Sequence, residues 1–383
     1  PTTIVPRDLT LNGQEGPYFE AQELRALAEY AIVTVVPADA NATAAQRAEF
    51  YFYAGMGYLL LAENFSAAPI VPDGDAVPGP TLLNLAIQNF DLGLAVSTAA
   101  DLGTRLHLAK ARAFRLAGNA AQAGAEADLA LAAGPANYVF VSRYDVANDQ
   151  NSSAQFAYSR NLHDVQPLPR LDFLDPKFIT LDAPIPVLKM EEAHLIKAEV
   201  ALAGGNFAGC KQAIADAITL AKGRATTNFR DVDPRTNRPG AGTVKASPTA
   251  PEIAGLILDR KGATVPVPTI TSSSLNPADV LALNEANPVE IMRILYLARQ
   301  EIFFFEGRRM CDLGIRLPMM EREIETNPAI NAGGAGTVVV VPSYIPPNDD
   351  MDKFTVSGTV VTILHDMNQV IADNRVSPFP MPF

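Results

Sequence analysis

The 383-residue chain contains no tryptophan, only two cysteines and only four histidines. Two cysteines, Cys210 and Cys311, are too few for a disulfide framework or for a zinc site built from several thiolates. Whether these two form one disulfide bond stays open on the sequence alone. No stretch approaches the roughly 18–20 uninterrupted apolar residues of a membrane-spanning helix. The composition therefore excludes disulfide-rich and helical integral-membrane classes.

Charge is sparse, and one sign predominates. Charged residues make up 19 % of the chain, and 30 Lys and Arg against 42 Asp and Glu give a formal net charge of −12. An excess of negative charge disfavours nucleic acids and anionic membrane surfaces as partners. The hydrophobic share of 48 % is too high for a disordered chain. We expect a globular protein that does not bind nucleic acid.

The sequence patterns of common catalytic sites are absent. There is no Gly-x-Ser-x-Gly elbow, Walker loop, dinucleotide fingerprint or His-Glu-x-x-His. Glu191 and His194 form one Glu-x-x-His half-motif, but a carboxylate-bridged di-iron bundle needs a second one, and no other histidine supplies it. We therefore expect no enzyme, no metal centre and no cofactor.

An acidic loop near the C-terminus is a weak calcium candidate. It contains Asp349, Asp350 and Asp352 but lacks the glycine and the final glutamate of an EF-hand loop. A solvated acidic turn is the favoured interpretation.

Aromatic residues in predicted loops are the candidates for stacking on a ligand, because binding residues are common on loops. No spacing singles them out, so the ligand site itself stays unknown. The candidates are Tyr138, Phe140, Tyr144, Phe229 and Tyr344.

Apolar residues recur at helical spacing through the alanine-rich N-terminal third. This pattern predicts helices over 18–36, 43–65 and 81–98, with Thr43 and Gln46 forming a capping box. Two further segments, 102–135 and 189–223, each predict a helix, a Gly/Asn break and a second helix. Small residues at fixed offsets in these pairs are typical of tetratricopeptide repeats.

The remaining chain is rich in loop signals, with 30 prolines and 25 glycines overall. A long helix is predicted over 288–313, and the β-branched segments 337–341 and 354–363 predict a small hairpin. We expect a mainly α fold of irregular tetratricopeptide-like helix pairs with long Pro/Gly-rich loops and at most a small β-hairpin. The prediction is one domain over 1–383, with inserted loops at about 138–186 and 224–287.

Four segments resemble the SusD/RagB-like family of outer-membrane nutrient-binding proteins. The most specific is 299–313, in which Glu306-Gly-x-Arg309 is followed by Asp-Leu. The segment 190–199, Met-Glu-Glu-Ala-His-Leu-Ile-Lys-Ala-Glu, is similar to the helix that opens a later tetratricopeptide unit in that family. Asp175–Phe178 and Leu59–Pro69 match two further family elements.

The resemblance implies a helical surface lipoprotein without catalysis. Such a protein captures glycans or peptides for a TonB-dependent transporter barrel, on the extracellular face of the outer membrane. Its lipid anchor would lie in a segment outside this sequence. The alternative is a structural or assembly subunit of a cell-surface complex built on the same scaffold, and homo- or hetero-oligomerisation is left open.

The family motif also has a physical interpretation from the residues themselves. Glu306, Arg309 and Asp312 lie three residues apart at the end of a predicted helix, where such neighbours can pair. Gly307 is expected to permit a close backbone approach. We interpret Glu306, Arg309 and Asp312 as a structural ion-pair cluster, and we do not expect any of the four residues to contact a ligand.

Overall fold

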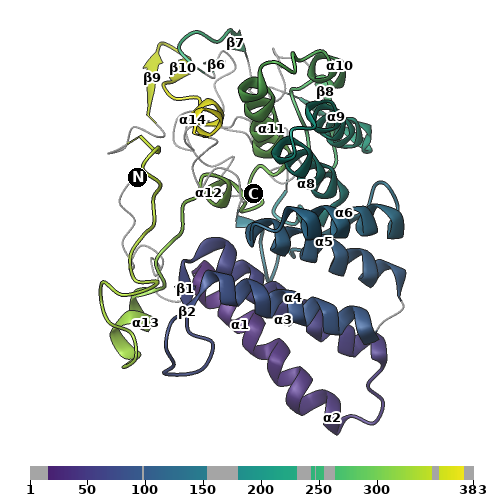
Figure 1. The fold of residues 1–383 in the computed structure, drawn as a ribbon, viewed down its shortest axis with the longest axis vertical. Coiled ribbons are helices and arrows are strands. Elements are labelled where there is room, and N and C mark those ends of the chain that lie inside the picture. The colour runs from purple at the N-terminus through teal and green to yellow at the C-terminus, as the bar shows by residue number, and fades with distance from the viewer. Residues whose placement is uncertain are drawn as a thin grey trace. The chain divides into compact units, whose positions relative to one another are not determined.

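The computed structural model describes residues 16–96, 99–152, 180–230, 243–245, 247–253, 264–346 and 353–374. The chain divides into two compact units. The first unit combines Thr3–Pro135 with Met310–Ser343, and the second combines Ala136–Arg309 with Tyr344–Val376. Helices dominate both units, which confirms the mainly α class (Figure 1). A single domain over 1–383 stays a prediction.

The first unit begins with a helical hairpin. Its elements are α1 (Pro17–Tyr30), the π-helical turn η2 (Ala31–Val35), α2 (Val36–Ala38) and α3 (Ala44–Asn64). The capping box is present, since Thr43 Oγ1 accepts a hydrogen bond from Gln46 N at 3.2 Å and Gln46 Oε1 accepts one from Thr43 N at 2.9 Å. Helix α1 packs along α3, so the first two predicted helices are confirmed.

The next three helices of this unit contain the first predicted repeat. They are α4 (Gly79–Val96), α5 (Ala100–Leu116) and α6 (Ala120–Ala133). Gly118 has a φ of +74°, which ends α5, and the Asn119 side chain caps α6. Ala111, Ala123 and Ala130 are fully buried. Small side chains therefore let α5 and α6 approach closely, as predicted.

Two short strands and a short helix complete the first unit. The strands β1 (Ala67–Ala68) and β2 (Val77–Pro78) pair antiparallel, and α13 (Glu321–Thr326) follows later in the chain. Gly336 has a φ of +77°, and a Cβ there would lie 2.6 Å from the carbonyl oxygen of Ala67. Only glycine fits this close approach.

The second unit contains the second predicted repeat. Its helices are α8 (Met190–Ala203), α9 (Phe207–Gly223), α10 (Pro277–Leu281), α11 (Pro288–Ile302) and α14 (Met367–Asp373). Gly205 has a φ of +72° between α8 and α9, and Asn206 Oδ1 caps α9 by accepting from Gly209 N at 2.9 Å. Helix α11 packs against α8, α9 and α14.

The long helix predicted over 288–313 is wrong beyond Ile302. Phe305 has a φ of +57° and Gly307 a φ of +75°, and the left-handed region cannot continue a right-handed helix. A separate short helix, α12 (Arg309–Asp312), follows this break.

Strands are more numerous than the one hairpin that we expected. In the second unit, β3 (Val139–Ser142) pairs with β4 (Ile185–Lys189), and β5 (Thr226–Arg230) pairs with β8 (Thr264–Pro268), both antiparallel. A four-stranded sheet has the order β7 (Glu252–Ile253), β6 (Thr243–Lys245), β10 (Val360–Ile363), β9 (Phe354–Ser357). The hairpin predicted from 337–341 and 354–363 together is wrong in its partners, because 354–363 forms a hairpin by itself as β9 and β10.

The other segment predicted to join that hairpin does not do so. Val340 forms only an isolated antiparallel bridge with Arg316. Parts of the two predicted inserted loops, together with Asp175–Phe178, lie outside the described residues. Among the helices that the structure describes, none has the length and apolar composition needed to cross a bilayer.

Candidate functional site

The loop aromatics predicted from the sequence have different environments in the second unit. Tyr138 is only 6 % exposed, and its carbonyl oxygen accepts a hydrogen bond from Met190 N at 3.1 Å. Its burial leaves no open ring face for a ligand. Phe140 in β3, Tyr144 after that strand, and Tyr344 are each partly exposed. Phe229 lies in β5, where its backbone pairs with Val265.

The acidic residues suggested as a calcium candidate, Asp349, Asp350 and Asp352, lie outside the described residues. Within the part of the chain that the structure describes, no group of three or more His, Cys, Asp or Glu side chains is arranged to hold a metal ion.

Glu306 of the family motif forms a buried ion pair with Lys189. The Lys189 Nζ and Glu306 Oε1 atoms are 2.6 Å apart, and the two side chains are 1 % and 2 % exposed. Lys189 Nζ also donates a hydrogen bond to the carbonyl oxygen of Ile302 at 2.5 Å, and Thr271 Oγ1 donates to the same oxygen at 2.9 Å. The two opposite charges therefore compensate each other, and Lys189 also provides a hydrogen-bond donor for a carbonyl oxygen at the C-terminal end of α11.

The helical spacing that we expected within the motif is wrong, because Glu306 lies in the turn between α11 and α12. Arg309 and Asp312 contact residues that are distant in sequence. Arg309 donates to Asn368 Oδ1 at 2.8 Å, in the second unit, and Asp312 Oδ1 accepts from Arg115 at 3.0 Å, in the first unit.

The role predicted for Gly307 is also corrected. A Cβ added at this position would meet no atom within 4 Å, so no close backbone approach requires glycine there. The positive φ of Gly307 is what requires glycine, because a residue with a side chain is strained in the left-handed region. Gly307 therefore shapes the turn that presents Glu306 to Lys189.

The segment 190–199 and the part of the segment 299–313 up to Arg309 contact each other in the second unit. Lys189 directly precedes α8, which contains the first segment, and Glu306 belongs to the second. Arg299 of α11 lies 3.6 Å from Glu199 of α8, with side-chain exposures of 2 % and 0 %. Two buried charge pairs thus connect segments that are about a hundred residues apart in the chain.

A third buried pair anchors the N-terminal end of α8, next to Lys189. Arg224, which follows α9, makes two hydrogen bonds of 2.6 Å to the carboxylate of Glu191, and its Nη1 donates to the carbonyl oxygen of Asn137 at 3.0 Å. Bidentate pairing of this kind fixes both distance and orientation. Glu191, the first residue of the Glu-x-x-His half-motif, is therefore held in a structural ion pair with Arg224.

Sequence reasoning missed a buried carboxylate on α11. Glu301 Oε2 accepts hydrogen bonds from Ser273 Oγ at 2.8 Å and from Ser274 N at 2.9 Å, and Oε1 accepts one from Ser274 Oγ. Burial raises the pKa of Glu301 to about 7, although these hydrogen bonds and Lys222 oppose the shift. The run of hydroxyl residues over 271–274 was the available signal, but its position opposite Glu301 depends on the tertiary fold.

The two cysteines are free thiols, and both are buried. Burial raises the pKa of Cys210 to about 12 and also raises that of Cys311. A thiol in such surroundings is a poor nucleophile, because the thiolate is the reactive form. Neither cysteine offers covalent catalysis.

Comparisons with known proteins give structural neighbours only. No family model matches the chain, and no curated protein matches it. A SusD-like protein of Bacteroides fragilis NCTC 9343 has a TM-score of 0.45 and 9 % sequence identity, over 79 % of this chain and 74 % of that one. A SusD-like carbohydrate-binding protein of Bacteroides vulgatus ATCC 8482 has a TM-score of 0.39 and 13 % identity, over 77 % and 67 %.

Proposed function

We propose that the protein is a non-catalytic, SusD-like ligand-binding protein of the cell surface, which captures glycans or peptides for a TonB-dependent outer-membrane transporter. One observation carries the proposal. The segments 190–199 and 299–313, which resemble that family in sequence, are joined in the second unit by the buried pair Glu199–Arg299. Lys189, the residue directly before the first segment, forms a second buried pair with Glu306. The resemblance therefore concerns one connected piece of structure and not two isolated matches.

The ligand role assigned to the loop aromatics stays part of this proposal. Partly exposed rings are available at Phe140, Tyr144 and Tyr344, and aromatic rings offer apolar faces to sugars and to peptide side chains. We expect that replacing Tyr144 by Ala weakens binding of an oligosaccharide or peptide found in a screen. Loss of binding without a change in thermal stability supports the role, and unchanged affinity in Y144A, F140A and Y344A contradicts it.

The localisation follows the same proposal: the extracellular face of the outer membrane, with a lipid anchor in a segment outside this sequence. Isolation from native membranes in mild detergent, with identification of the proteins that copurify, tests the partner. A TonB-dependent barrel in the purified material supports the proposal.

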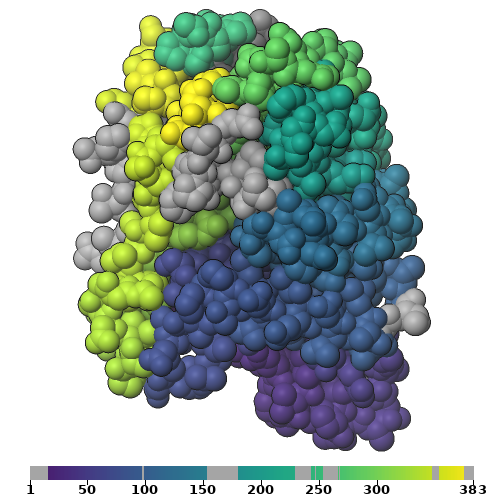
Figure 2. All heavy atoms as spheres, in the orientation of Figure 1, coloured from purple at the N-terminus to yellow at the C-terminus, as the bar shows by residue number. Residues whose placement is uncertain are grey.

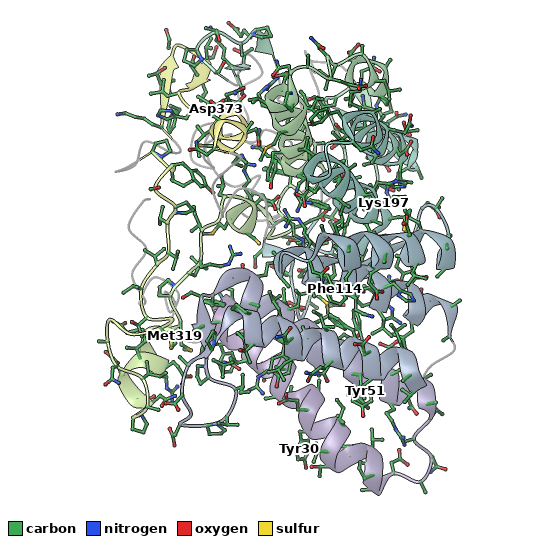
Figure 3. All side chains as sticks on the ribbon, viewed as in Figure 1. Tyr30, Tyr51, Phe114, Lys197, Met319 and Asp373 are labelled. Carbon is green, nitrogen blue, oxygen red and sulfur yellow. The ribbon has the colours of Figure 1, made fainter. Side chains whose placement is uncertain are left out.

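A second candidate function is a structural or assembly subunit, and one surface feature favours it. The outer side of α1 and η2 exposes large apolar side chains in the first unit, where Tyr30 is labelled in Figure 3. These side chains are Phe19, Leu27, Tyr30, Val33 and Val35, at 40 %, 61 %, 59 %, 74 % and 45 % exposure. Exposed apolar patches commonly mark protein interfaces.

The variants Y30A and Y144A separate the two candidates. The ligand-capture function predicts that Y144A loses ligand and that Y30A keeps it. The assembly function predicts that Y30A and L27A lower the oligomeric state. It also predicts that no ligand is found for Y144A or for Y30A.

A further inference from the structure

The chain contains three Asn-x-Ser/Thr triplets, which begin at Asn41, Asn64 and Asn151. In exported proteins this triplet is the acceptor for an N-linked glycan, provided that the middle residue is not proline. Asp39 stands two residues before Asn41, and Asp149 two residues before Asn151. An acidic residue therefore precedes the triplets at Asn41 and Asn151 at the same distance.

Two of the three asparagines are closed to a transferase. Asn151 is fully buried, and its Nδ2 donates a hydrogen bond to the carbonyl oxygen of Ala183 at 2.7 Å. Asn64 ends α3, its Nδ2 donates to the carbonyl oxygen of Leu60 at 2.9 Å, and the next residue, Phe65, is buried. In both cases the nitrogen that would receive the sugar already donates a hydrogen bond to a backbone carbonyl oxygen.

Asn41 has the opposite environment. It lies in the turn between α2 and α3, at the end of the helical hairpin of the first unit, where Asp39, Asn41 and Thr43 are all exposed (Figure 1). The purple atoms of this hairpin form the lowest part of the view in Figure 2. Asn41 N donates to Asp39 Oδ1 at 2.8 Å. Among the described residues, the Asn41 side-chain amide has no hydrogen-bond partner.

We propose that Asn41 is an N-glycosylation site. The donor is an oligosaccharide linked through a diphosphate to a polyprenyl lipid. Asn41 Nδ2 attacks C1 of the first sugar, the bond from C1 to the diphosphate oxygen breaks, and the polyprenyl diphosphate leaves. The new C1–Nδ2 bond replaces one amide N–H bond, whose proton passes to a base of the transferase. No oxidant or reductant is involved.

The hydroxyl of Thr43, which a transferase must also recognise, caps α3. It accepts from Gln46 N at 3.2 Å and donates to Gln46 Oε1 at 2.9 Å. Helix ends open locally far more readily than a protein unfolds, so the triplet becomes available without loss of the fold. Asn151, held by a buried hydrogen bond, has no such local route.

Peptide mapping of the protein purified from its native source tests the site. Trypsin cleavage after Arg25 and Arg47 releases the peptide 26–47 with Asn41, and cleavage after Arg143 and Arg160 releases 144–160 with Asn151. We expect a glycan on 26–47 and none on 144–160. A native protein whose 26–47 peptide is unmodified in every molecule overturns the proposal, and so does a glycan on Asn151.

A second experiment uses a host in which the transferase is known to be present. The full chain is exported to the periplasm of a bacterial host that carries an oligosaccharyltransferase and its lipid-linked donor. We expect one glycan on the wild type and on T43S, and no glycan on N41Q or T43A. An unmodified wild type, or a glycan that persists in N41Q, overturns the proposal.

The inference requires export of the chain, as the proposed function does, but the two can fail separately. A native protein that copurifies with a transporter barrel and has no glycan contradicts only the glycosylation site. A glycosylated protein without any barrel contradicts only the proposed partner.

Discussion

Lys189 and Glu306 form a 2.6 Å ion pair from which solvent is almost entirely excluded. Lys189 directly precedes α8, and Glu306 lies in the turn after α11. The pair therefore joins the start of the second helical repeat to the family motif. Because both charges are desolvated, their mutual attraction offsets part of the cost of burying them.

Replacing Glu306 by Gln is expected to destabilise the second unit by about 3–5 kcal/mol, because it removes one partner of a buried ion pair. Denaturant unfolding monitored by circular dichroism measures the change. The double variant K189M/E306L should recover most of this loss, since the carbonyl oxygen of Ile302 keeps the hydrogen bond from Thr271.

The exposed pair of Glu290 and Arg293 is the matched control. Their side chains are 33 % and 25 % exposed, and their atoms are 2.8 Å apart. We expect E290Q to cost less than about 1 kcal/mol. Equal costs for E306Q and E290Q would contradict the importance of burial for the Lys189–Glu306 pair.

Glu301 makes stability depend on pH. Its pKa in the folded protein is raised to about 7 from its ordinary value of 4.5. The folded state therefore binds this proton more tightly than the unfolded state does. The Glu301 contribution to stability is greatest below pH 4.5 and declines as the pH rises through 7. The total decline is roughly 2–4 kcal/mol.

The variant E301Q isolates this contribution. Its amide oxygen can accept from both Ser273 Oγ and Ser274 N, and its amide nitrogen can donate to Ser274 Oγ, so the geometry of the protonated acid is retained. Compared with wild type, we expect E301Q to be clearly more stable at pH 8 and nearly unchanged at pH 4. A constant difference at all pH values would contradict the titration of Glu301.

Two glycine-to-alanine substitutions should have opposite signs. Gly307 has a φ of +75°, so G307A is expected to destabilise by about 1–2 kcal/mol through backbone strain alone. Gly103 lies in α5 with open space around its Cβ position, so G103A should stabilise by about 0.5–1 kcal/mol. Thermal unfolding compares the two, and stabilisation by G307A would contradict the left-handed turn.

The thiols of Cys210 and Cys311 should be unreactive in the native protein, because burial raises the pKa of both. Reaction with Ellman's reagent should detect no thiol at neutral pH and two thiols after denaturation. Reductant should leave the melting temperature unchanged, since both cysteines are free. One fast-reacting thiol under native conditions would contradict their burial.

The helices were the part of the fold that the sequence predicts well, because their signals are local. Capping residues such as Thr43 and Asn206, and the glycines at 118 and 205, mark helix ends without reference to the rest of the chain. The end of α11 was missed because Phe305 adopts a positive φ. A phenylalanine rarely does so, and only the tertiary structure enforces it.

The candidate site was less predictable, because its contacts join distant parts of the chain. The sequence shows Glu306, Arg309 and Asp312 as a motif. Their respective partners, Lys189, Asn368 and Arg115, are not indicated by any spacing. Glu301 was missed for the same reason. Its serine partners precede it by 27 and 28 residues.

The most direct test of the proposed function is purification of the native protein from its source membranes in mild detergent, followed by mass spectrometry of the copurifying proteins. Our account predicts a TonB-dependent transporter barrel in stoichiometric amount. Recovery of the chain as a self-assembled particle or filament without a barrel would contradict it and would favour the assembly function.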